Sequence, residues 1–312
     1  MSRPLPDKVQ EAARAFCDLT VRAETSPLTP EEMHESLRNF DAVVPTLGDM
    51  YSAEVFAAVP EPRAKLLANF GVGFNHIDVA AAQSAGIAVS NTPGAVTDAT
   101  ADIAMTLILM AARRAGEGER LLRAGRWEGW HPTQLLGVHL GGKTVGIVGM
   151  GRIGQAIARR CHYGFGMNIA YHSRSPKDLA FPAQLSSSLT DLAASVDFLV
   201  LAVPGGAQTH HLVDAKVLDA LGRNAFLINI ARGNVVDEAA LINALQGGSI
   251  AGAGLDVYEF EPQAPQTLID MENVVLLPHL GTAALEVREE MGLMSVANLR
   301  AFADGGALPN PV

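Results

Sequence analysis

Residues 144–160, TVGIVGMGRIGQAIARR, constrain the fold of this chain more than any other stretch. An apolar, β-branched run that suits a buried parallel strand leads into Gly149, Gly151 and Gly154, spaced as G-x-G-x-x-G. Apolar residues then recur at helical spacing. Strand, glycine turn and helix in this order are the context that a dinucleotide-binding fingerprint requires. The stretch therefore predicts that a dinucleotide pyrophosphate binds at the start of a helix.

The three glycines have different predicted roles. Gly149 permits a tight turn, Gly151 lets the backbone approach the pyrophosphate, and Gly154 lets the helix pack close to the strand. The N-terminus of the helix adds free N–H groups and the positive end of its dipole. Arg152 and Ile153 stand between the second and third glycines, so we expect them to line the same site.

Composition excludes several classes of function. The 312 residues suffice for two domains, and a net charge of -10 argues against nucleic acid or an anionic membrane as a partner. Cys17 and Cys161 are too few for a disulfide framework, and residues 1–12 lack the apolar core of a signal peptide. The longest apolar run, residues 103–112, is too short to span a bilayer. We therefore expect a cytoplasmic protein.

Predicted helices and strands alternate along the chain, which indicates an α/β fold with parallel sheets. One long helix is expected over residues 99–123 and a closing helix over 285–302. The expected strands are residues 19–21, 41–45, 66–70, 87–90, 145–148, 168–171, 198–203, 225–230, 252–257 and 274–277.

Polar side chains follow three consecutive predicted strands. Arg232 follows the first, an acidic segment ending in Glu261 follows the second, and His279 follows the third. Ligands bind at this edge of open α/β sheets, so we expect the three side chains to share one site. A guanidinium binds a carboxylate bidentately, and an imidazole donates a proton near neutral pH. A carboxylate behind the imidazole stabilises its charged form. This chemistry fits hydride transfer to a 2-keto acid.

The chain resembles the D-isomer-specific 2-hydroxyacid dehydrogenases in six motifs, which occur in that family's order. They are NFGVGFNHID from Asn69, NTPGAVTDATADIA from Asn91, VGMGRIG from Val148, NIARGNVVDEAAL from Asn229, GAGLDVYEFEP from Gly252 and PHLGT from Pro278. The resemblance implies that Arg232 binds substrate, that His279 is the acid/base and that Glu261 pairs with it.

The resemblance also implies further contacts. The backbone N–H groups of Val72 and Gly73 would bind the substrate carboxylate, and we expect Leu47 to meet the substrate's tail. Thr97 and Asp256 would contact the nicotinamide end of the cofactor. Further cofactor contacts are expected at Pro204, Ile230, Ala231, His279 and Gly281.

The implied architecture has two domains. A Rossmann-type, doubly wound coenzyme domain would span residues 94–283. A flavodoxin-like substrate domain would join residues 1–93 to 284–312. The region 99–137 would form the interface of a homodimer. Members of the family usually place a short strand before the segment that matches residues 3–6. Almost nothing precedes it here, so we expect either a stunted first strand or a chain start further upstream.

The expected cofactor is NADP rather than NAD. An NAD site has an Asp or Glu about 20 residues after the first glycine. Here Ser173 and Arg174 follow the second strand of the motif, and no acid appears before Asp178. Ser173 can donate a hydrogen bond to a 2′-phosphate, and Arg174 can pair with it. The alternative is an ordinary solvated basic turn.

The function expected is NADPH-dependent reduction of small 2-keto acids, such as glyoxylate or hydroxypyruvate, to D-2-hydroxy acids. GWHPTQLLG from Gly129 is most similar to the glyoxylate and hydroxypyruvate reductase branch. The alternatives are a non-catalytic dinucleotide sensor, or an NAD-dependent dehydrogenase for a bulkier substrate. No metal is expected, because His210 and His211 have no His, Cys or acid nearby at a usual ligand spacing.

Overall fold

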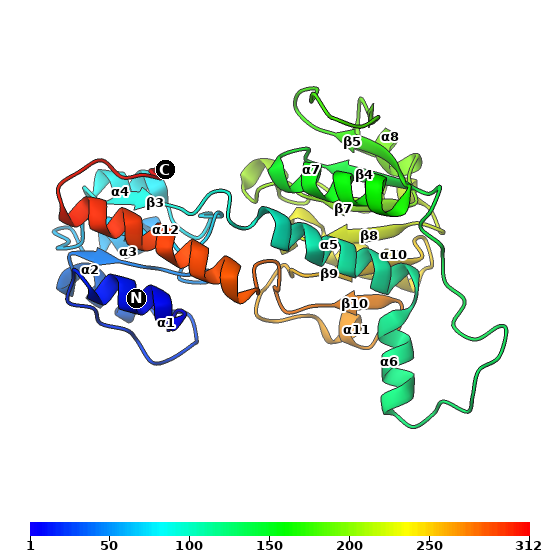
Figure 1. The fold of residues 1–312 in the computed structure, drawn as a ribbon, viewed down its shortest axis with the longest axis horizontal. Coiled ribbons are helices and arrows are strands. Elements are labelled where there is room, and N and C mark those ends of the chain that lie inside the picture. Colours follow the sequence, from blue (N-terminus) through cyan, green and yellow to red (C-terminus); the bar gives the residue numbers. More distant parts are fainter. The chain divides into compact units, whose positions relative to one another are not determined.

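A computed structural model describes residues 1–312. The chain forms two compact units, and Figure 1 labels their elements. The larger unit is Thr97–Gly281, and the smaller unit joins Met1–Val96 to Thr282–Val312. Both units contain a parallel sheet with helices, so the predicted α/β fold is confirmed. No helix has the length and the apolar character needed to cross a membrane.

The larger unit is built on a sheet of seven parallel strands in the order β10-β9-β8-β7-β4-β5-β6. The strands are β4 (Thr144–Val148), β5 (Asn168–His172), β6 (Gln184–Leu185), β7 (Phe198–Leu201), β8 (Phe226–Asn229), β9 (Gly252–Leu255) and β10 (Val274–Leu276). The chain runs outward from β4 to β6, then returns to β7 on the other side of β4. This reversal places the topological switch point of a Rossmann-type sheet at the carboxyl ends of β4 and β7.

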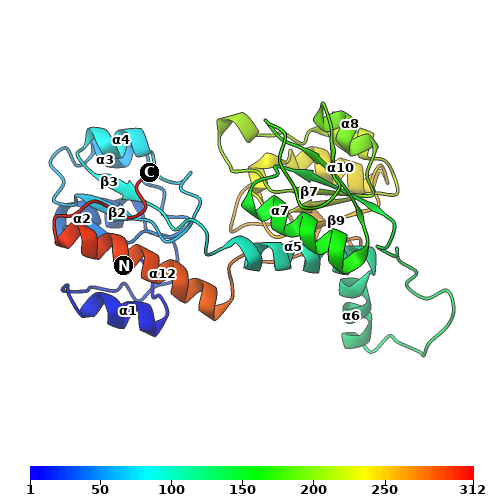
Figure 2. The same cartoon turned by 45° about the horizontal axis from the view of Figure 1, so that its top comes forward.

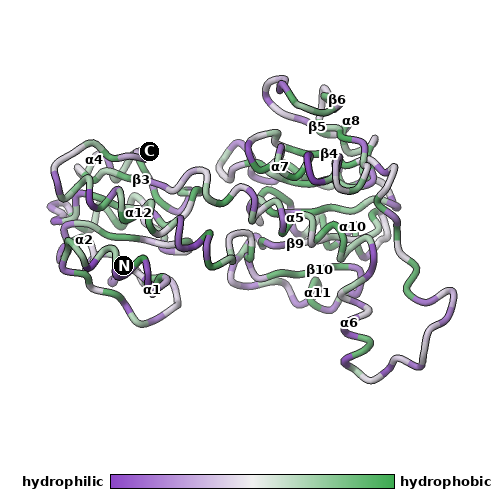
Figure 3. The backbone as a smooth tube through the Cα atoms, in the orientation of Figure 1, coloured by the Kyte–Doolittle hydropathy of each residue, from purple (hydrophilic) through white to green (hydrophobic).

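Helices cover both faces of this sheet, and Figure 2 shows α7 and α10 on opposite sides. Successive residues of one strand point to opposite faces. Phe198 and Val200 pack with α5 and α7, whereas Leu199 and Leu201 pack with α8, α9 and α10. The helices are α5 (Thr97–Ala112), α6 (Ala115–Arg123), α7 (Arg152–Arg159), α8 (Leu189–Ala194), α9 (Ala215–Leu221), α10 (Glu238–Gln246) and α11 (Gln266–Ile269). Figure 3 shows hydrophobic residues concentrated on α5 and the strands behind it.

The prediction of one long helix over residues 99–123 is wrong. α5 ends at Ala112, and Arg114 adopts a left-handed conformation with φ 53° before α6 starts. The chain returns to this point later, where Val138 N–H donates to the Ala112 carbonyl at 2.7 Å. Gly137 passes so close to the same carbonyl that a Cβ would collide with it. The returning segment therefore occupies the space that a continuing helix would need.

The smaller unit has three parallel strands, β1 (Ala42–Val43), β2 (Leu66–Ala68) and β3 (Ala88–Ser90), in that order. Its helices are α1 (Asp7–Arg14), α2 (Pro30–Asn39), α3 (Ala53–Ala57), α4 (Val79–Ser84) and α12 (Leu285–Ala303). One face of the sheet packs against α1 and α12, which lie side by side in Figure 1. The other face packs against α2, α3 and α4.

The strand predicted at residues 19–21 is absent. The ammonium group of Met1 donates to the Thr20 carbonyl at 2.8 Å, and Arg22 N–H donates to the Met1 carbonyl at 3.2 Å. Ser2 N–H in turn donates to the Val44 carbonyl, beside β1, at 3.1 Å. Residues 19–21 therefore pair with the N-terminal segment and not with a regular strand.

Candidate active site

His279 and Glu261 form a hydrogen-bonded pair, with 2.9 Å between His279 Nδ1 and Glu261 Oε2. The loops after β9 and β10 carry them, and these strands are neighbours in the sheet. The second oxygen of Glu261 accepts the Tyr258 N–H at 3.1 Å. His279 has a left-handed backbone, φ 54°, and its N–H donates to the Asp256 carbonyl at 2.9 Å. Glu261 thus holds the Nδ1 side of the ring, which leaves Nε2 for proton transfer.

The charge state of Glu261 suits this pairing. Burial by itself would raise the pKa of Glu261. The hydrogen bond and charge of His279, the Tyr258 N–H and the Arg232 charge act in the opposite direction and leave this pKa below its usual value. Glu261 is therefore ionised at neutral pH and can stabilise an imidazolium.

Arg232 follows β8 and lies beside the same loop. Asn229 Nδ2 donates to the Arg232 carbonyl at 3.0 Å, and Asn229 Oδ1 accepts the Ala231 N–H at 3.0 Å. Gly233 then packs against the Tyr258 backbone with no room for a Cβ. Burial lowers the pKa of Arg232, and the charge of Glu261 opposes that change. The structure therefore brings Arg232, Glu261 and His279 together.

Asp256 anchors the other side of the His279 loop. It is buried, and its two oxygens accept the N–H groups of Leu280 at 2.6 Å and Gly281 at 2.8 Å. Burial raises the pKa of Asp256, although these N–H groups and His279 act against the rise. Thr100 Oγ1 donates to the Gly281 carbonyl at 3.1 Å. The first turn of α5, which begins at Thr97, therefore lies close to Asp256 and Gly281.

The glycine turn joins β4 to α7 as predicted. Gly149 has φ 95° and packs against the Ala202 carbonyl, and Gly154 packs against the Gly149 carbonyl. In contrast, a Cβ on Gly151 would meet nothing within 4 Å. No side chain caps the start of α7 at Gly151, where Arg152 is exposed and Ile153 half-buried. An uncapped helix N-terminus beside an open glycine fits the pyrophosphate of a dinucleotide.

The remaining predicted cofactor contacts lie at neighbouring strand ends. Pro204 follows β7, next to β4, and its carbonyl accepts Thr209 Oγ1 at 2.8 Å. Ile230 and Ala231 are buried directly after β8.

Ser173 and Arg174 follow β5, on the other side of β4. Ser173 Oγ donates to the Ser175 carbonyl at 2.6 Å, and Lys177 Nζ donates to Ser175 Oγ at 3.1 Å. Arg174 is exposed and forms no ion pair. This turn therefore presents a guanidinium that no carboxylate neutralises.

Val72, Gly73 and Leu47 belong to the smaller unit. Asn91 Nδ2 donates to the Val72 carbonyl at 2.9 Å, and Asn69 Nδ2 donates to the Gly73 carbonyl at 3.0 Å. These bonds fix the loop after β2, whereas the N–H groups of Val72 and Gly73 donate no hydrogen bond. Leu47 lies in a different loop, where its carbonyl accepts Arg3 Nη1 at 2.7 Å.

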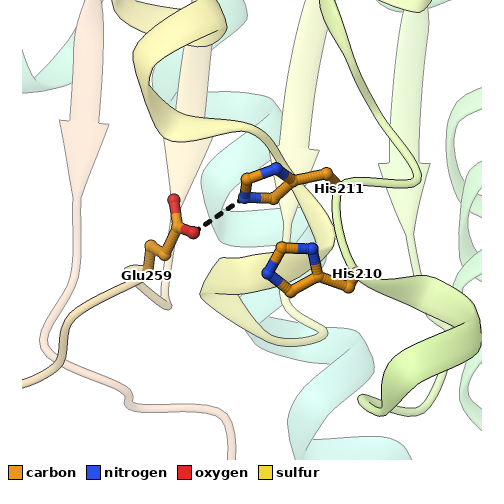
Figure 4. A group of neighbouring side chains, drawn as sticks. All are labelled: His210, His211 and Glu259. Carbon is orange, nitrogen blue, oxygen red and sulfur yellow. Dashed lines mark hydrogen bonds and ion pairs between the residues drawn. The ribbon is translucent and has the colours of Figure 1, made fainter.

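The sequence offers no ligand for His210 and His211 at a usual spacing, but the fold brings an acid to them. Glu259 Oε1 is 2.7 Å from His211 Nε2, although 48 residues separate them in the chain (Figure 4). The loops that carry these residues meet in the fold. Spacing along the sequence cannot show such a contact.

Three residues that support the site were not singled out from the sequence: Asn229, Gly233 and Tyr258. Tyr258 links both members of the His279–Glu261 pair, because its N–H donates to Glu261 and its hydroxyl donates to the Leu277 carbonyl at 2.9 Å, two residues before His279. All three belong to the motifs that contain Arg232 and Glu261. In the sequence, only their position within those motifs indicated that these three residues support the site.

Comparison with known proteins agrees with this geometry. The model of the "D-isomer specific 2-hydroxyacid dehydrogenase, NAD binding domain" family matches residues 105–281. The chain belongs to this family. The larger unit therefore contains its nicotinamide dinucleotide-binding domain, and the chain is an oxidoreductase.

Individual relatives of this dehydrogenase family match the whole chain. Glyoxylate reductase from Thermococcus kodakarensis is 44% identical over 100% of this chain and 95% of its own length. Two crystal structures also match: the TT0316 protein from Thermus thermophilus, and an NADPH-dependent glyoxylate/hydroxypyruvate reductase from Sinorhizobium meliloti in complex with NADP and malonate. The first has a TM-score of 0.92 and 40% identity and covers 100% of this chain and 98% of its own. The second has a TM-score of 0.86 and 39% identity, and the match covers 100% of this chain and 95% of the reductase chain.

Proposed function

We propose that this dehydrogenase reduces small 2-keto acids to D-2-hydroxy acids with NADPH as the hydride donor. The observation that carries the proposal is the His279–Glu261 hydrogen bond of 2.9 Å beside Arg232. An acid/base, its charged partner and a carboxylate-binding guanidinium are the groups that protonation of a keto-acid carbonyl requires. The bound nicotinamide would supply the hydride.

Each residue has a distinct proposed role. Arg232 binds the substrate carboxylate and polarises the neighbouring carbonyl. His279 donates the Nε2 proton to the carbonyl oxygen as it becomes an alcohol, and Glu261 stabilises the charged ring before that transfer. In the smaller unit, which we assign to substrate binding, the N–H groups of Val72 and Gly73 take the carboxylate. Leu47 meets the substrate's tail.

The proposed substrates are glyoxylate, hydroxypyruvate and keto acids of similar size. The names of the two relatives, a glyoxylate reductase and a glyoxylate/hydroxypyruvate reductase, support this choice. The test is a panel of glyoxylate, hydroxypyruvate, pyruvate and phenylpyruvate, each with NADPH and with NADH. We expect the highest kcat/KM with one of the first two. Preference for phenylpyruvate would refute the substrate assignment. Cofactor binding without turnover of any substrate would refute catalysis.

Preference for NADPH is proposed from Ser173 and Arg174. No acid stands at the end of β5, where an NAD site would use one to bind the ribose hydroxyls. The exposed Arg174 can pair with the 2′-phosphate instead.

We also propose a homodimer formed through residues 99–137. This region carries several exposed large hydrophobic side chains: Leu122 (60% exposed), Trp127 (52%), Trp130 (80%) and Leu136 (64%). Such a concentration is typical of a surface that a partner covers. Light scattering should give twice the chain mass, and Trp130→Glu with Leu136→Glu should shift it toward the single chain.

A further inference from the structure

Three potential metal ligands converge on one side of the larger unit, at His210, His211 and Glu259 (Figure 4). Their ligand atoms all lie within 4.8 Å of one another. The two imidazole rings stack with centroids 3.9 Å apart and an interplanar angle of 28°. Figure 4 shows that each ring directs a nitrogen toward Glu259.

The backbone fixes this arrangement. His211 adopts a left-handed conformation with φ 48°, which brings its ring onto the same side as that of His210. Its N–H donates to the Asn234 carbonyl at 2.8 Å. Adjacent residues in an extended chain point in opposite directions. The unusual backbone of His211 is therefore what lets consecutive imidazoles face one carboxylate.

The charge around this cluster is negative. Only 13% of the Glu259 side chain is exposed, and a second carboxylate, Glu238, is buried next to it. Glu238 Oε2 accepts the Glu259 N–H at 3.3 Å. Neither carboxylate forms an ion pair with a lysine or an arginine, so His211 is the one basic partner. Two partly desolvated carboxylates that have no lysine or arginine partner favour the binding of a cation.

We propose that His210, His211 and Glu259 bind a zinc ion. Two imidazole nitrogens and one carboxylate oxygen are a donor set that zinc favours, and a water molecule would complete four-coordination. Ligands on a tetrahedral zinc lie about 3.4 Å apart, given bonds of about 2.1 Å. The 2.7 Å separation between His211 Nε2 and Glu259 Oε1 therefore opens slightly as zinc replaces the shared proton. The neutral ring then carries its proton on Nδ1, which leaves the Nε2 lone pair for zinc.

The ion would join two segments that border the active site. Glu259 stands two residues before Glu261, and the two histidines follow the turn that begins at Pro204. Zinc there would fix the catalytic loop to that turn without contacting the reacting groups. The inference goes beyond the proposed function and does not depend on it, because no substrate or cofactor contact enters the argument.

Isothermal titration of the full chain with ZnCl₂ tests the proposal. The parent should bind one zinc ion per chain. His210→Ala and Glu259→Gln should each weaken that binding by about tenfold or more. His131→Ala replaces an exposed histidine elsewhere and should leave binding unchanged. Titration with Co²⁺ gives a second readout, since a four-coordinate site should produce visible absorption that both site variants lack.

The catalytic pair needs its own control, because His279 and Glu261 also place a nitrogen and an oxygen 2.9 Å apart. The His279→Ala variant should still bind one zinc ion per chain. Loss of binding in His279→Ala alone would overturn the proposal, as would unchanged binding in both His210→Ala and Glu259→Gln. Circular dichroism and NADPH binding show whether each variant is folded, and neither requires turnover.

Discussion

Asp49 is completely buried and forms an ion pair with Arg3, with 3.1 Å between Asp49 Oδ1 and Arg3 Nη2. The same carboxylate accepts Ser2 Oγ at 2.6 Å, Thr46 N–H at 2.7 Å and Leu28 N–H at 2.9 Å. Arg3 also holds the Leu47 carbonyl. One carboxylate thus joins the N-terminal segment to the loop that we assign to the substrate's tail.

Asp49→Ala should lower the free energy of unfolding by about 3–5 kcal/mol, because it leaves a partly buried guanidinium and several donors without a partner. Urea denaturation measures this loss. Asp41→Ala is the matched control, since it removes an exposed pair with Arg63 and should change stability little. Equal effects of the two substitutions would contradict the role given to Asp49.

Arg232→Lys should lower kcat/KM for keto acids by about 100-fold, because lysine keeps the charge but loses the planar fork that binds a carboxylate. Steady-state kinetics with glyoxylate measures the loss. The midpoint of urea unfolding and the affinity for NADPH should stay close to those of the parent. Near-parental turnover would remove Arg232 from substrate binding.

Glu261→Gln should shift the pH profile of reduction toward acid, since the charged ring of His279 loses the carboxylate that stabilises it. The profile of kcat/KM against pH is the measurement. Glu286→Gln, which changes an exposed glutamate on α12, should leave the profile in place. An unchanged profile in a folded, NADPH-binding Glu261→Gln variant would break the proposed pairing.

The same substitution has a consequence for stability. The pKa of Glu261 is lower in the folded chain than its usual value, so ionised Glu261 favours folding. This contribution is fully present above the unfolded pKa of about 4.3 and is lost as the pH falls through the lower, folded value. The parent should therefore lose more stability than Glu261→Gln between pH 6 and pH 3. Parallel curves would contradict the lowered pKa.

Gly233→Ala should destabilise the chain by about 1–3 kcal/mol and reduce turnover, because the new methyl group would collide with the Tyr258 backbone. Thermal and urea unfolding report the first effect, and glyoxylate reduction the second. Gly164→Ala makes the same change where nothing lies within 4 Å and should be tolerated. A fully active and stable Gly233→Ala variant would show that the two loops are not packed this closely.

Arg174→Ala should raise KM for NADPH about tenfold and leave KM for NADH nearly unchanged, because only NADPH carries the 2′-phosphate. Arg223→Ala removes another exposed arginine and should change neither value. The proposed pairing of Arg174 with the 2′-phosphate would be refuted if the parent prefers NADH. It would also be refuted if Arg174→Ala raises KM equally for both cofactors.

The sequence predicted those parts of the fold that local chemistry determines. The glycine turn after β4 forms as predicted, because Gly149 and Gly154 each lie too close to a backbone carbonyl for a side chain to fit. The polar residues after β8, β9 and β10 could be placed together because neighbouring parallel strands end at one edge.

The predictions failed where a distant segment decides the local structure. The break at Arg114 depends on the return of Gly137 and Val138, which no helical pattern reveals. In the sequence, nothing distinguishes Asp49 from other acidic residues in loops. In the fold, residues from three segments of the chain surround it. The contact between His211 and Glu259 likewise exists only after the sheet has formed.

The loops after three adjacent strands hold Arg232, Glu261 and His279, so the spacing of the sheet, about 4.8 Å per strand, sets the distances among these charges. The strands β1, β2 and β3 form a separate sheet and do not affect these distances. In that unit, other side chains hold the loops of Leu47, Val72 and Gly73. Substitutions in the smaller unit can therefore accumulate without moving His279, the proposed proton donor. Under the proposed function, a lineage built on this plan can change what it reduces while keeping how it reduces it.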